Sequence, residues 1–550
     1  MPSAPKPPPE RPKTLSKLDF ERQQMVNWFS PRVLADAALR VVLSSVFGQY
    51  ADKRDFQAAL DPGLAIPHTY GPEHEVDGAL WLDFVADLGD GFDSTYAVAC
   101  LLARPQLEVS DGDGPPQVLP RGRVLVMGGD EVYPVATREE YEDRFRGPYA
   151  MALPASSDPA PPLFAIPGNH DWYDGLTNFL RFFCAKREIG AWQTKQKRSY
   201  FALELPHRWW LLAIDIQLDT YIDEPQLEYF RRVGLKAGDR VILVTGKPSW
   251  VKVDDPKKPP DSYKNLQYFT NEVVSAAGAE VCVTLSGDLH HYFHYRSEER
   301  EHDFVTSGGG GAYLYPTHTT PESRELPEGT YKKTDASFPS PEESKRLTWG
   351  ALKMPLLACD LCIAIGVFYA IFAAAVFAQP SADWTVVGVA TGLTMLLSLI
   401  AFADGDPKPL RWVFGTIHAV AHMALAAAVA TLFTEIGWTL LPLLAVAWLG
   451  GFLLGGVLFG LYLIVSHRWA PRHANDVLAC QGIPDYKNFL RLRLDEDGLT
   501  IFPLGVRRVP REWETDPDGR PEDPCLRPVD RELEVELIEP PFRVHGPAAN

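Results

Sequence analysis

Residues 162–171, PLFAIPGNHD, decide the fold of the central part of this 550-residue chain. The segment is an apolar run of strand length, then a proline–glycine turn, then Asn169, His170 and Asp171. Buried strands of layered α/β proteins deliver functional side chains in this way, at their carboxyl ends. We therefore expect an amide, an imidazole and a carboxylate at one edge of a sheet.

Four further segments between residues 75 and 320 repeat this pattern of an apolar run with a polar or glycine-rich end. They are ADLGDGFDST (86–95), with Asp87 and Asp90; GGDEVY (128–133), with Asp130 and Tyr133; VTGKPSW (244–250), with Gly246 and Lys247; and SGDLHHYFHY (286–295), with Asp288, His290, His291 and His294. An Asp-Gly pair alone indicates only a turn. The ordered series of carboxylates, an amide and imidazoles, each after a strand, indicates a site for divalent metal ions.

The series resembles the calcineurin-like metallophosphoesterase superfamily over about residues 75–320. Asp87-Leu88-Gly89 and Asp130-Glu131-Val132-Tyr133 are similar to motifs of its purple acid phosphatase branch. The resemblance implies an α/β fold, a calcineurin-like two-sheet β-sandwich flanked by helices. It also implies a hydrolase that cleaves a phosphate ester with a metal-activated water.

The resemblance implies two divalent metal ions, drawn from Mn, Fe, Mg or Zn. Asp87, Tyr133 and His290 would hold one ion, and Asp130 would bridge to a second ion held by Asn169 and Asp288. In the second position Gly246 stands where the family has an imidazole, and Asp288 replaces another imidazole. Such a harder, oxygen-rich site favours Mn²⁺ or Mg²⁺ over Zn²⁺. A single-metal site stays open, as does completion of the ligand set by Asp90, His291 or His294.

His170 and Asp171 are the catalytic candidates. Next to the metals, His170 would stabilise the transition state or protonate the leaving oxygen, with Asp171 orienting its imidazole. Lys247, beside the missing imidazole, could add positive charge or could simply be solvated.

Four apolar segments of membrane-spanning length follow at about residues 355–377, 384–403, 413–433 and 440–465. Lys and Arg residues precede the first segment, separate the second and third, and follow the fourth. By the positive-inside rule, the chain is a multi-pass protein of the cell membrane, with its catalytic domain and both termini in the cytoplasm. Within the spans, His418 and His422 share a helical face, where a metal, a haem, Asp360 or an interhelical hydrogen bond could engage them.

The composition excludes some partners and compartments. With 53 Lys and Arg against 71 Asp and Glu, the formal net charge is −18, which argues against a general nucleic-acid binder. Seven scattered cysteines indicate a reducing compartment rather than a disulfide scaffold. No signal peptide is expected at the start of the sequence.

We expect six regions along the chain. These are a disordered Pro-rich tail (1–15), an N-terminal helical segment (16–74), the metallophosphoesterase domain (75–320), a linker (321–350), an α-helical four-span transmembrane bundle (351–468) and a small β-containing C-terminal region (469–550). In the last region, FLRLRLDEDGLTIFPLG (489–505) predicts a β-hairpin.

The predicted function is a membrane-anchored, cytoplasmic-facing, metal-dependent phosphoesterase. Because its anchor holds it near lipid head groups, its phosphate-ester substrate could be a lipid. The alternative is a catalytically weak or inactive phosphoesterase-like regulatory or scaffold protein, suggested by Gly246 and Asp288. A transporter or channel is a further alternative, although the four spans contain few charged residues and would make a poor transport path. The oligomeric state stays open.

Overall fold

The computed structural model describes residues 11–36, 66–110, 115–156, 160–216, 221–403, 408–437, 439–470 and 472–544. The chain divides into two compact units. The larger comprises Met1–Val26, Ala37–Pro341 and Pro484–Asn550, and the smaller comprises Asn27–Asp36 and Glu342–Ile483. Residues 37–65 of the predicted N-terminal helical segment (16–74) and residues 1–10 of the predicted tail (1–15) lie outside the described residues.

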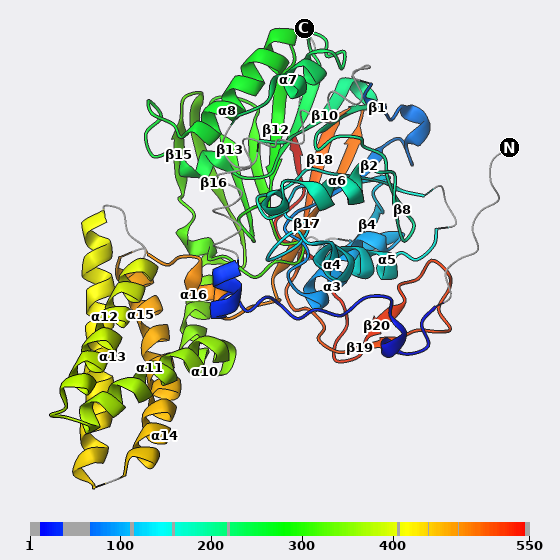
Figure 1. Ribbon diagram of the computed structural model, residues 1–550. Helices are drawn as coiled ribbons and strands as arrows, with labels where there is room; N and C mark the ends of the chain where they lie inside the picture. Colours follow the sequence, from blue (N-terminus) through cyan, green and yellow to red (C-terminus); the bar gives the residue numbers. More distant parts are fainter. Residues whose placement is uncertain are drawn as a thin grey trace. The chain divides into compact units, whose positions relative to one another are not determined.

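Within its described residues, the larger unit contains two nine-stranded sheets (Figure 1). The first has the order β21–β18–β17–β2–β5–β6–β8–β7, with β22 beside β18. Its strands are β2 (Leu80–Val85), β5 (Val124–Met127), β6 (Pro162–Ala165), β7 (Glu188–Ile189), β8 (Trp192–Thr194), β17 (Lys487–Asp495), β18 (Gly498–Val506), β21 (Glu536–Leu537) and β22 (Phe542–Val544).

The second sheet has the order β1–β9–β10–β11–β12–β14–β13–β16–β15. Its strands are β1 (His68–Thr69), β9 (Phe201–Leu205), β10 (Trp209–Ile214), β11 (Arg240–Thr245), β12 (Glu280–Ser286), β13 (Tyr292–Ser297), β14 (Asp303–Ser307), β15 (Ser323–Leu326) and β16 (Gly329–Phe338). The centres of both sheets are parallel: β2, β5 and β6 in one, β10, β11, β12 and β14 in the other. Their carboxyl ends therefore lie along common edges.

Alternating side chains make the two sheets a sandwich. Leu82 and Phe84 of β2 pack in one buried core with Leu211 of β10. The neighbours that point the other way enter separate outer cores, with Trp81 in one and Leu212 in the other. Near-continuous apolar strands are expected where both faces of a sheet are covered.

Helices cover the outer faces. The outer core of the first sheet includes residues of α3 (Phe92–Ala103), α5 (Gly147–Ala152) and α6 (Thr177–Phe183). The outer core of the second includes residues of α7 (Glu224–Arg231) and α8 (Asp261–Phe269) (Figure 1). The expected α/β architecture, two sheets flanked by helices, is confirmed.

The C-terminal hairpin predicted from residues 489–505 is present as β17 and β18, with Asp495 paired to Gly498 across the turn. It does not stand apart, because β17 pairs antiparallel with β2 in the first sheet. The expected linker at 321–350 differs as well, since β15 and β16 lie there and extend the second sheet. Sequence alternation indicates strands, but it does not indicate their partners.

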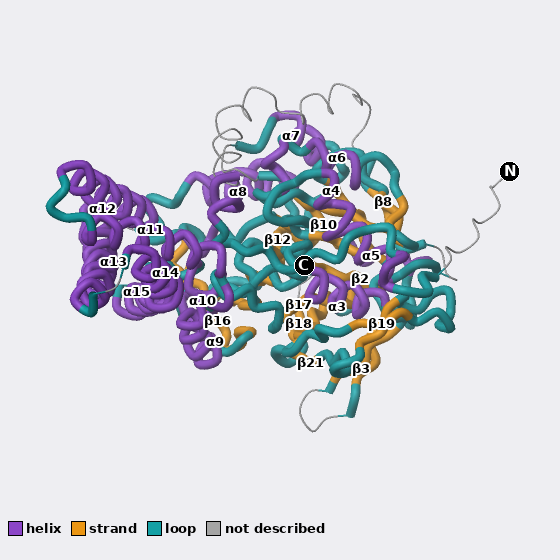
Figure 2. Tube along the Cα trace, turned by 60° about the horizontal axis from the view of Figure 1, so that its bottom comes forward, coloured by secondary structure: helices purple, strands orange, loops and turns teal. Residues whose placement is uncertain are grey.

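Among the described residues, four helices are long and apolar enough to cross a membrane, as predicted: Cys359–Phe377, Ala382–Phe402, Pro409–Glu435 and Leu440–Trp469. They correspond to α11 (Cys359–Phe377), α12 (Ala382–Phe402), α13 (Lys408–Glu435), and α14 (Leu440–Gly450) continued by a π-turn into α15 (Gly456–Trp469) (Figure 2). Glycines of the fourth helix pack against the first, since a Cβ on Gly451 would meet the Tyr369 ring at 2.7 Å. His422 Nε2 lies 3.2 Å from His418 Nε2, and its Nδ1 lies 3.0 Å from the Tyr369 hydroxyl.

Candidate active site

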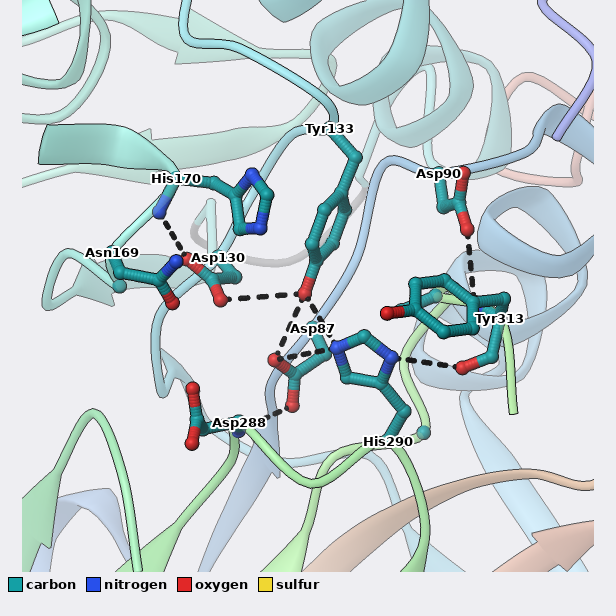
Figure 3. Close-up of polar contacts among 12 residues, drawn as sticks. Asp87, Asp90, Asp130, Tyr133, Asn169, His170, Asp288, His290 and Tyr313 are labelled. Carbon is teal, nitrogen blue, oxygen red and sulfur yellow. Dashed lines mark hydrogen bonds and ion pairs between the residues drawn. The ribbon is translucent and has the colours of Figure 1, made fainter. Parts of the chain in front are cut away.

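Side chains from four strand ends meet at one place in the larger unit (Figure 3). Asp87 follows β2, Asp130 follows β5 and His170 follows β6, all in the first sheet. Asp288 follows β12 of the second sheet. The backbone N–H of Asp288 donates to Asp87 Oδ2 at 2.8 Å, and that of His170 donates to Asp130 Oδ1 at 2.8 Å. The site therefore joins the two sheets through their carboxyl ends.

The three aspartates share an unusual backbone conformation. Asp87, Asp130 and Asp288 have φ angles of 58°, 54° and 69°, in the left-handed region that non-glycine residues rarely adopt. Each turns the chain sharply just after its strand. Strain of this kind persists where the surrounding structure enforces it and is concentrated at functional sites.

The Tyr133 hydroxyl lies at the centre of the cluster. It donates to Asp87 Oδ1 at 3.1 Å and lies 3.4 Å from Asp130 Oδ2 and 3.0 Å from His290 Nε2 (Figure 3). Asp87, Asp130, Tyr133 and His290 are all at most 4% exposed. Three of the predicted ligands thus lie within hydrogen-bonding reach of the hydroxyl of a fourth, Tyr133.

The hydrogen bonding of His290 presets its imidazole for metal ligation. Its Nδ1 lies 2.9 Å from the Tyr313 carbonyl oxygen, which can only accept, so Nδ1 carries the proton. Burial lowers the pKa of His290 well below its usual range, with Lys487 adding to the shift, and the ring is neutral. Its Nε2 lone pair therefore points into the cluster, the arrangement found in metal-binding histidines.

His170 and Asp171 are arranged differently from the expectation. His170 Nδ1 lies 2.8 Å from the Pro134 carbonyl oxygen, and burial lowers the pKa of His170 to about 4. Asp171 accepts the backbone N–H groups of Gly168 at 2.8 Å and Asp130 at 3.0 Å, and also the Tyr141 hydroxyl. The Pro134 carbonyl thus orients the His170 imidazole, and Asp171 holds two strand-end loops together.

Burial raises the pKa of both Asp87 and Asp130 well above the usual range of a carboxyl. Asp288 adds to both shifts, and Asp130 adds to that of Asp87. Three carboxylates so close together repel one another, so a cation between them would be strongly stabilised.

Glycines make room for these carboxylates. A Cβ on Gly168 would overlap the Asp130 carboxylate, and a Cβ on Gly308 would overlap that of Asp87. On Gly287, a Cβ would lie 2.6 Å from Asp87 Oδ2. The lack of a Cβ at these glycines therefore leaves space for the Asp87 and Asp130 carboxylates.

The donor set fits a divalent cation. It offers carboxylates, a phenol and an imidazole with its lone pair directed inward, and Asn169, His170 and Asp288 at the rim are partly exposed. In the described part of the chain, no three His, Cys, Asp or Glu side chains are already close enough to hold one ion. His290 Nε2 lies 3.8 Å from Asp87 Oδ1, and both atoms lie within hydrogen-bonding distance of the Tyr133 hydroxyl.

The three alternative ligands are engaged elsewhere. Asp90 accepts the backbone N–H groups of Val26 at 2.8 Å and Tyr313 at 2.9 Å. His291 Nε2 lies 3.2 Å from the Thr320 hydroxyl. His294 lies between two carboxylates, 3.3 Å from Asp303 and 3.0 Å from Glu539. None of the three completes the ligand set in this structure.

Gly246 and Lys247 follow β11, the neighbour of β12. Thr245 pairs with Ser286, and Lys247 and Asp288 each lie two residues beyond that pair. Lys247 is 7% exposed. The roles of the Pro134 and Tyr313 carbonyls could not be predicted from the sequence, because backbone acceptors carry no residue signature.

Comparisons with known proteins give only distant structural likeness. No family model and no curated protein matches the sequence. GAP50, "the anchor in the inner membrane complex of Plasmodium", is 12% identical over 48% of this chain and 84% of its own, with a TM-score of 0.32. Purple acid phosphatase PPD1 from yellow lupin (Lupinus luteus) seeds is 14% identical over 48% and 49%, with a TM-score of 0.30. PhoD is 10% identical over 48% and 63%, with a TM-score of 0.28. Likeness this low carries no functional argument, which must come from the side chains.

Proposed function

We propose that the chain is a membrane-anchored, metal-dependent phosphoesterase. The observation that carries the proposal is the convergence of Asp87, Asp130 and the inward-facing lone pair of His290 around the Tyr133 hydroxyl, with Asp288 hydrogen-bonded to Asp87 through its backbone. Mutually repelling carboxylates and a neutral imidazole form a donor set that a divalent cation would stabilise.

Two groups of residues would hold the metal. Asp87, Tyr133 and His290 form one set, and Asn169 and Asp288 form the other, with Asp130 between them. When bound, divalent ions lower the pKa of water and neutralise charge on a phosphoryl group. Because Asn169 and Asp288 offer only oxygen, we expect Mn²⁺ or Mg²⁺ rather than Zn²⁺ at their position.

His170 is the proposed acid–base residue. With the proton on Nδ1 facing the Pro134 carbonyl, the neutral ring presents a lone pair at Nε2. In this form His170 can accept a proton or a hydrogen bond, and it acts as an acid only after protonation. Asp171 is proposed as a positioning residue.

The substrate we propose is a phosphate ester held at or near a membrane, such as a lipid phosphate. Four helices of membrane-spanning length would keep the site near lipid head groups. The Lys and Arg residues that flank these helices favour a cytoplasmic catalytic domain and cytoplasmic termini.

The test is hydrolysis by the full-length protein in detergent. p-Nitrophenyl phosphate, bis-p-nitrophenyl phosphate and phosphatidic acid are offered with Mn²⁺, Mg²⁺ or Zn²⁺. We expect turnover with Mn²⁺ or Mg²⁺, at least a hundredfold lower in Asp130→Asn and His170→Ala. The control Asp254→Asn, which changes an exposed carboxylate, should keep wild-type activity. No turnover with any of the three metals would instead favour a regulatory protein without hydrolytic activity.

A further inference from the structure

The first two residues of β17 hold a glycine-rich loop, Gly308–Gly311, that follows β14. Asn488 Oδ1 accepts the Ser307 hydroxyl at 2.8 Å and the Gly309 backbone N–H at 3.2 Å. The Asn488 backbone N–H donates to the Gly309 carbonyl at 3.0 Å. Asn488 is fully buried, and a Cβ on Gly309 would overlap its side chain.

Lys487 adds a third attachment to the end of the same loop. Its ammonium group donates to the Ala312 carbonyl, and the side chain is fully buried. Burial lowers the pKa of Lys487 to about 8, and the carboxylate of Asp90 acts in the opposite direction. An ammonium is costly to bury, and the carbonyl and the carboxylate offset this cost.

The other side of the loop contacts the candidate active site. The N–H of Gly310 donates to the Ala86 carbonyl at 2.8 Å, and that of Ala312 donates to the Asp87 carbonyl at 2.9 Å. Just beyond, the Tyr313 carbonyl holds His290 Nδ1 (Figure 3). The loop therefore transmits the position of β17 to the backbone of Asp87 and to the ring of His290.

The two sides of this contact lie far apart in the sequence. β16 ends at Phe338, the membrane-type helices follow, and the chain re-enters the first sheet at Lys487. The loop and the residues that hold it thus come from opposite sides of the membrane segment in sequence.

We propose that Lys487 and Asn488 are positioning residues of the candidate active site. They clamp the loop so that His290 and Asp87 keep the geometry that a metal ion needs. The site is consequently complete only when the chain has returned from the membrane helices. The metal part of this inference rests on the proposed function, and the clamp itself does not.

Hydrogen exchange of the full-length protein in detergent, followed by mass spectrometry, tests the clamp without any metal. We expect Asn488→Ala to speed exchange in peptides covering residues 307–313 at least tenfold, with exchange in β11 unchanged. Lys487→Met replaces the ammonium with an apolar chain of similar length and should speed exchange in the same peptides. Arg493→Ala, on the same strand, is the control and should leave them as in the wild type. Unchanged exchange in both Lys487→Met and a folded Asn488→Ala would overturn the clamp.

A titration with Mn²⁺, followed by the electron paramagnetic resonance signal of the free ion, tests the link to the site. We expect the dissociation constant to rise at least tenfold in Asn488→Ala, while its circular dichroism matches the wild type. Wild-type affinity in a variant whose loop exchanges faster would overturn the positioning role. If the wild type itself binds no Mn²⁺, the proposed function fails, and the exchange result still decides the clamp.

Discussion

Asp87, Asp130 and Asp288 hold their carboxylates together at a cost in backbone strain. A non-glycine residue in a sparsely populated conformation costs about 1–3 kcal/mol. Glycine would relieve this strain at each position, but it would remove a carboxylate that we propose as a metal donor. The strain is thus a residue-level sign that these side chains are selected for chemistry rather than for folding.

Gly168→Ala tests the packing around Asp130. The new Cβ would overlap both the Asp130 carboxylate and the Asp130 backbone nitrogen, so a rotation of the carboxylate alone would not relieve the clash. We expect Mn²⁺ affinity to fall at least tenfold, measured by equilibrium titration. Gly450→Ala is the control, since its Cβ would lie an ordinary 3.5 Å from Val429. Equal affinity in the two variants would show that the Asp130 carboxylate is not a ligand.

His294 gives the larger unit a specific dependence on pH. Burial alone would lower its pKa, but Asp303 and Glu539 stabilise the charged ring and leave the pKa raised. Because the folded pKa exceeds the unfolded value of about 6.5, this contribution is full below that pH. It is lost as the pH rises through the folded pKa.

We therefore expect the melting temperature to fall by a few degrees more in the wild type than in His294→Gln as pH rises from 6 to 9. Differential scanning fluorimetry measures both proteins. His302→Gln is the matched control, because burial lowers the pKa of His302 to about 3 and it is neutral throughout. A wild type and a His294→Gln variant with parallel pH profiles would contradict the assignment.

At this scale the sequence identifies which residues gather but not how each one is used. Asp87 and Asp130 follow apolar runs that form neighbouring parallel strands, and the ends of such strands meet at one sheet edge, so their convergence was predictable. The role of Asp171 was not predictable. Its position next to His170 in the sequence suggested that it orients the His170 ring, but the fold turns its carboxylate toward the backbone N–H groups of Gly168 and Asp130.

At the level of elements, β17 connects the C-terminal segment to the first sheet, because it pairs with β2. Its Arg491 lies opposite Asp83 of β2 and forms a bidentate pair, with Nε–Oδ1 at 2.7 Å and Nη2–Oδ2 at 3.1 Å. Both residues are buried. Removing one partner of such a pair leaves an uncompensated charge, which costs about 3–5 kcal/mol.

Asp83→Asn should therefore destabilise the folded protein by about 3–5 kcal/mol, measured by chemical denaturation in detergent. The double variant Asp83→Leu with Arg491→Leu should recover much of that loss, because it buries no charge. Arg493→Ala, whose side chain is partly exposed, should change stability little. A small effect of Asp83→Asn would mean that Arg491 is compensated by other groups.

Period-two alternation made the β17–β18 hairpin predictable as an element, while its place in the sheet was not. Pairing of β17 with β2 joins residues more than four hundred positions apart. Residues 321–350 are a similar case. β15 and β16 lie at the margin of the second sheet and are mostly polar, so their sequence predicted a linker rather than strands.

For the whole molecule, the membrane-type helices are an insertion between two strands of one sandwich. Residues 1–350 alone would lack β17 and β18 and would leave one edge of β2 unpaired. An exposed edge next to an open apolar core favours aggregation. We expect this fragment to be insoluble, and co-expression with residues 484–550 to restore a soluble complex, measured by size-exclusion chromatography. A fragment that is monomeric and binds Mn²⁺ alone would contradict this view of the fold.

The four helices were the most predictable large feature, because length and hydrophobicity alone define a membrane-spanning segment. Their orientation and the cytoplasmic placement of the site stay predictions. The site depends on how two sheets meet, which no local pattern encodes.

The most direct test of the central claim is the metal content of the purified full-length protein, measured by elemental analysis beside Asp130→Asn. We predict one to two divalent ions per wild-type chain and a clear loss in the variant. No bound metal in the wild type, even after Mn²⁺ is supplied, would contradict the account.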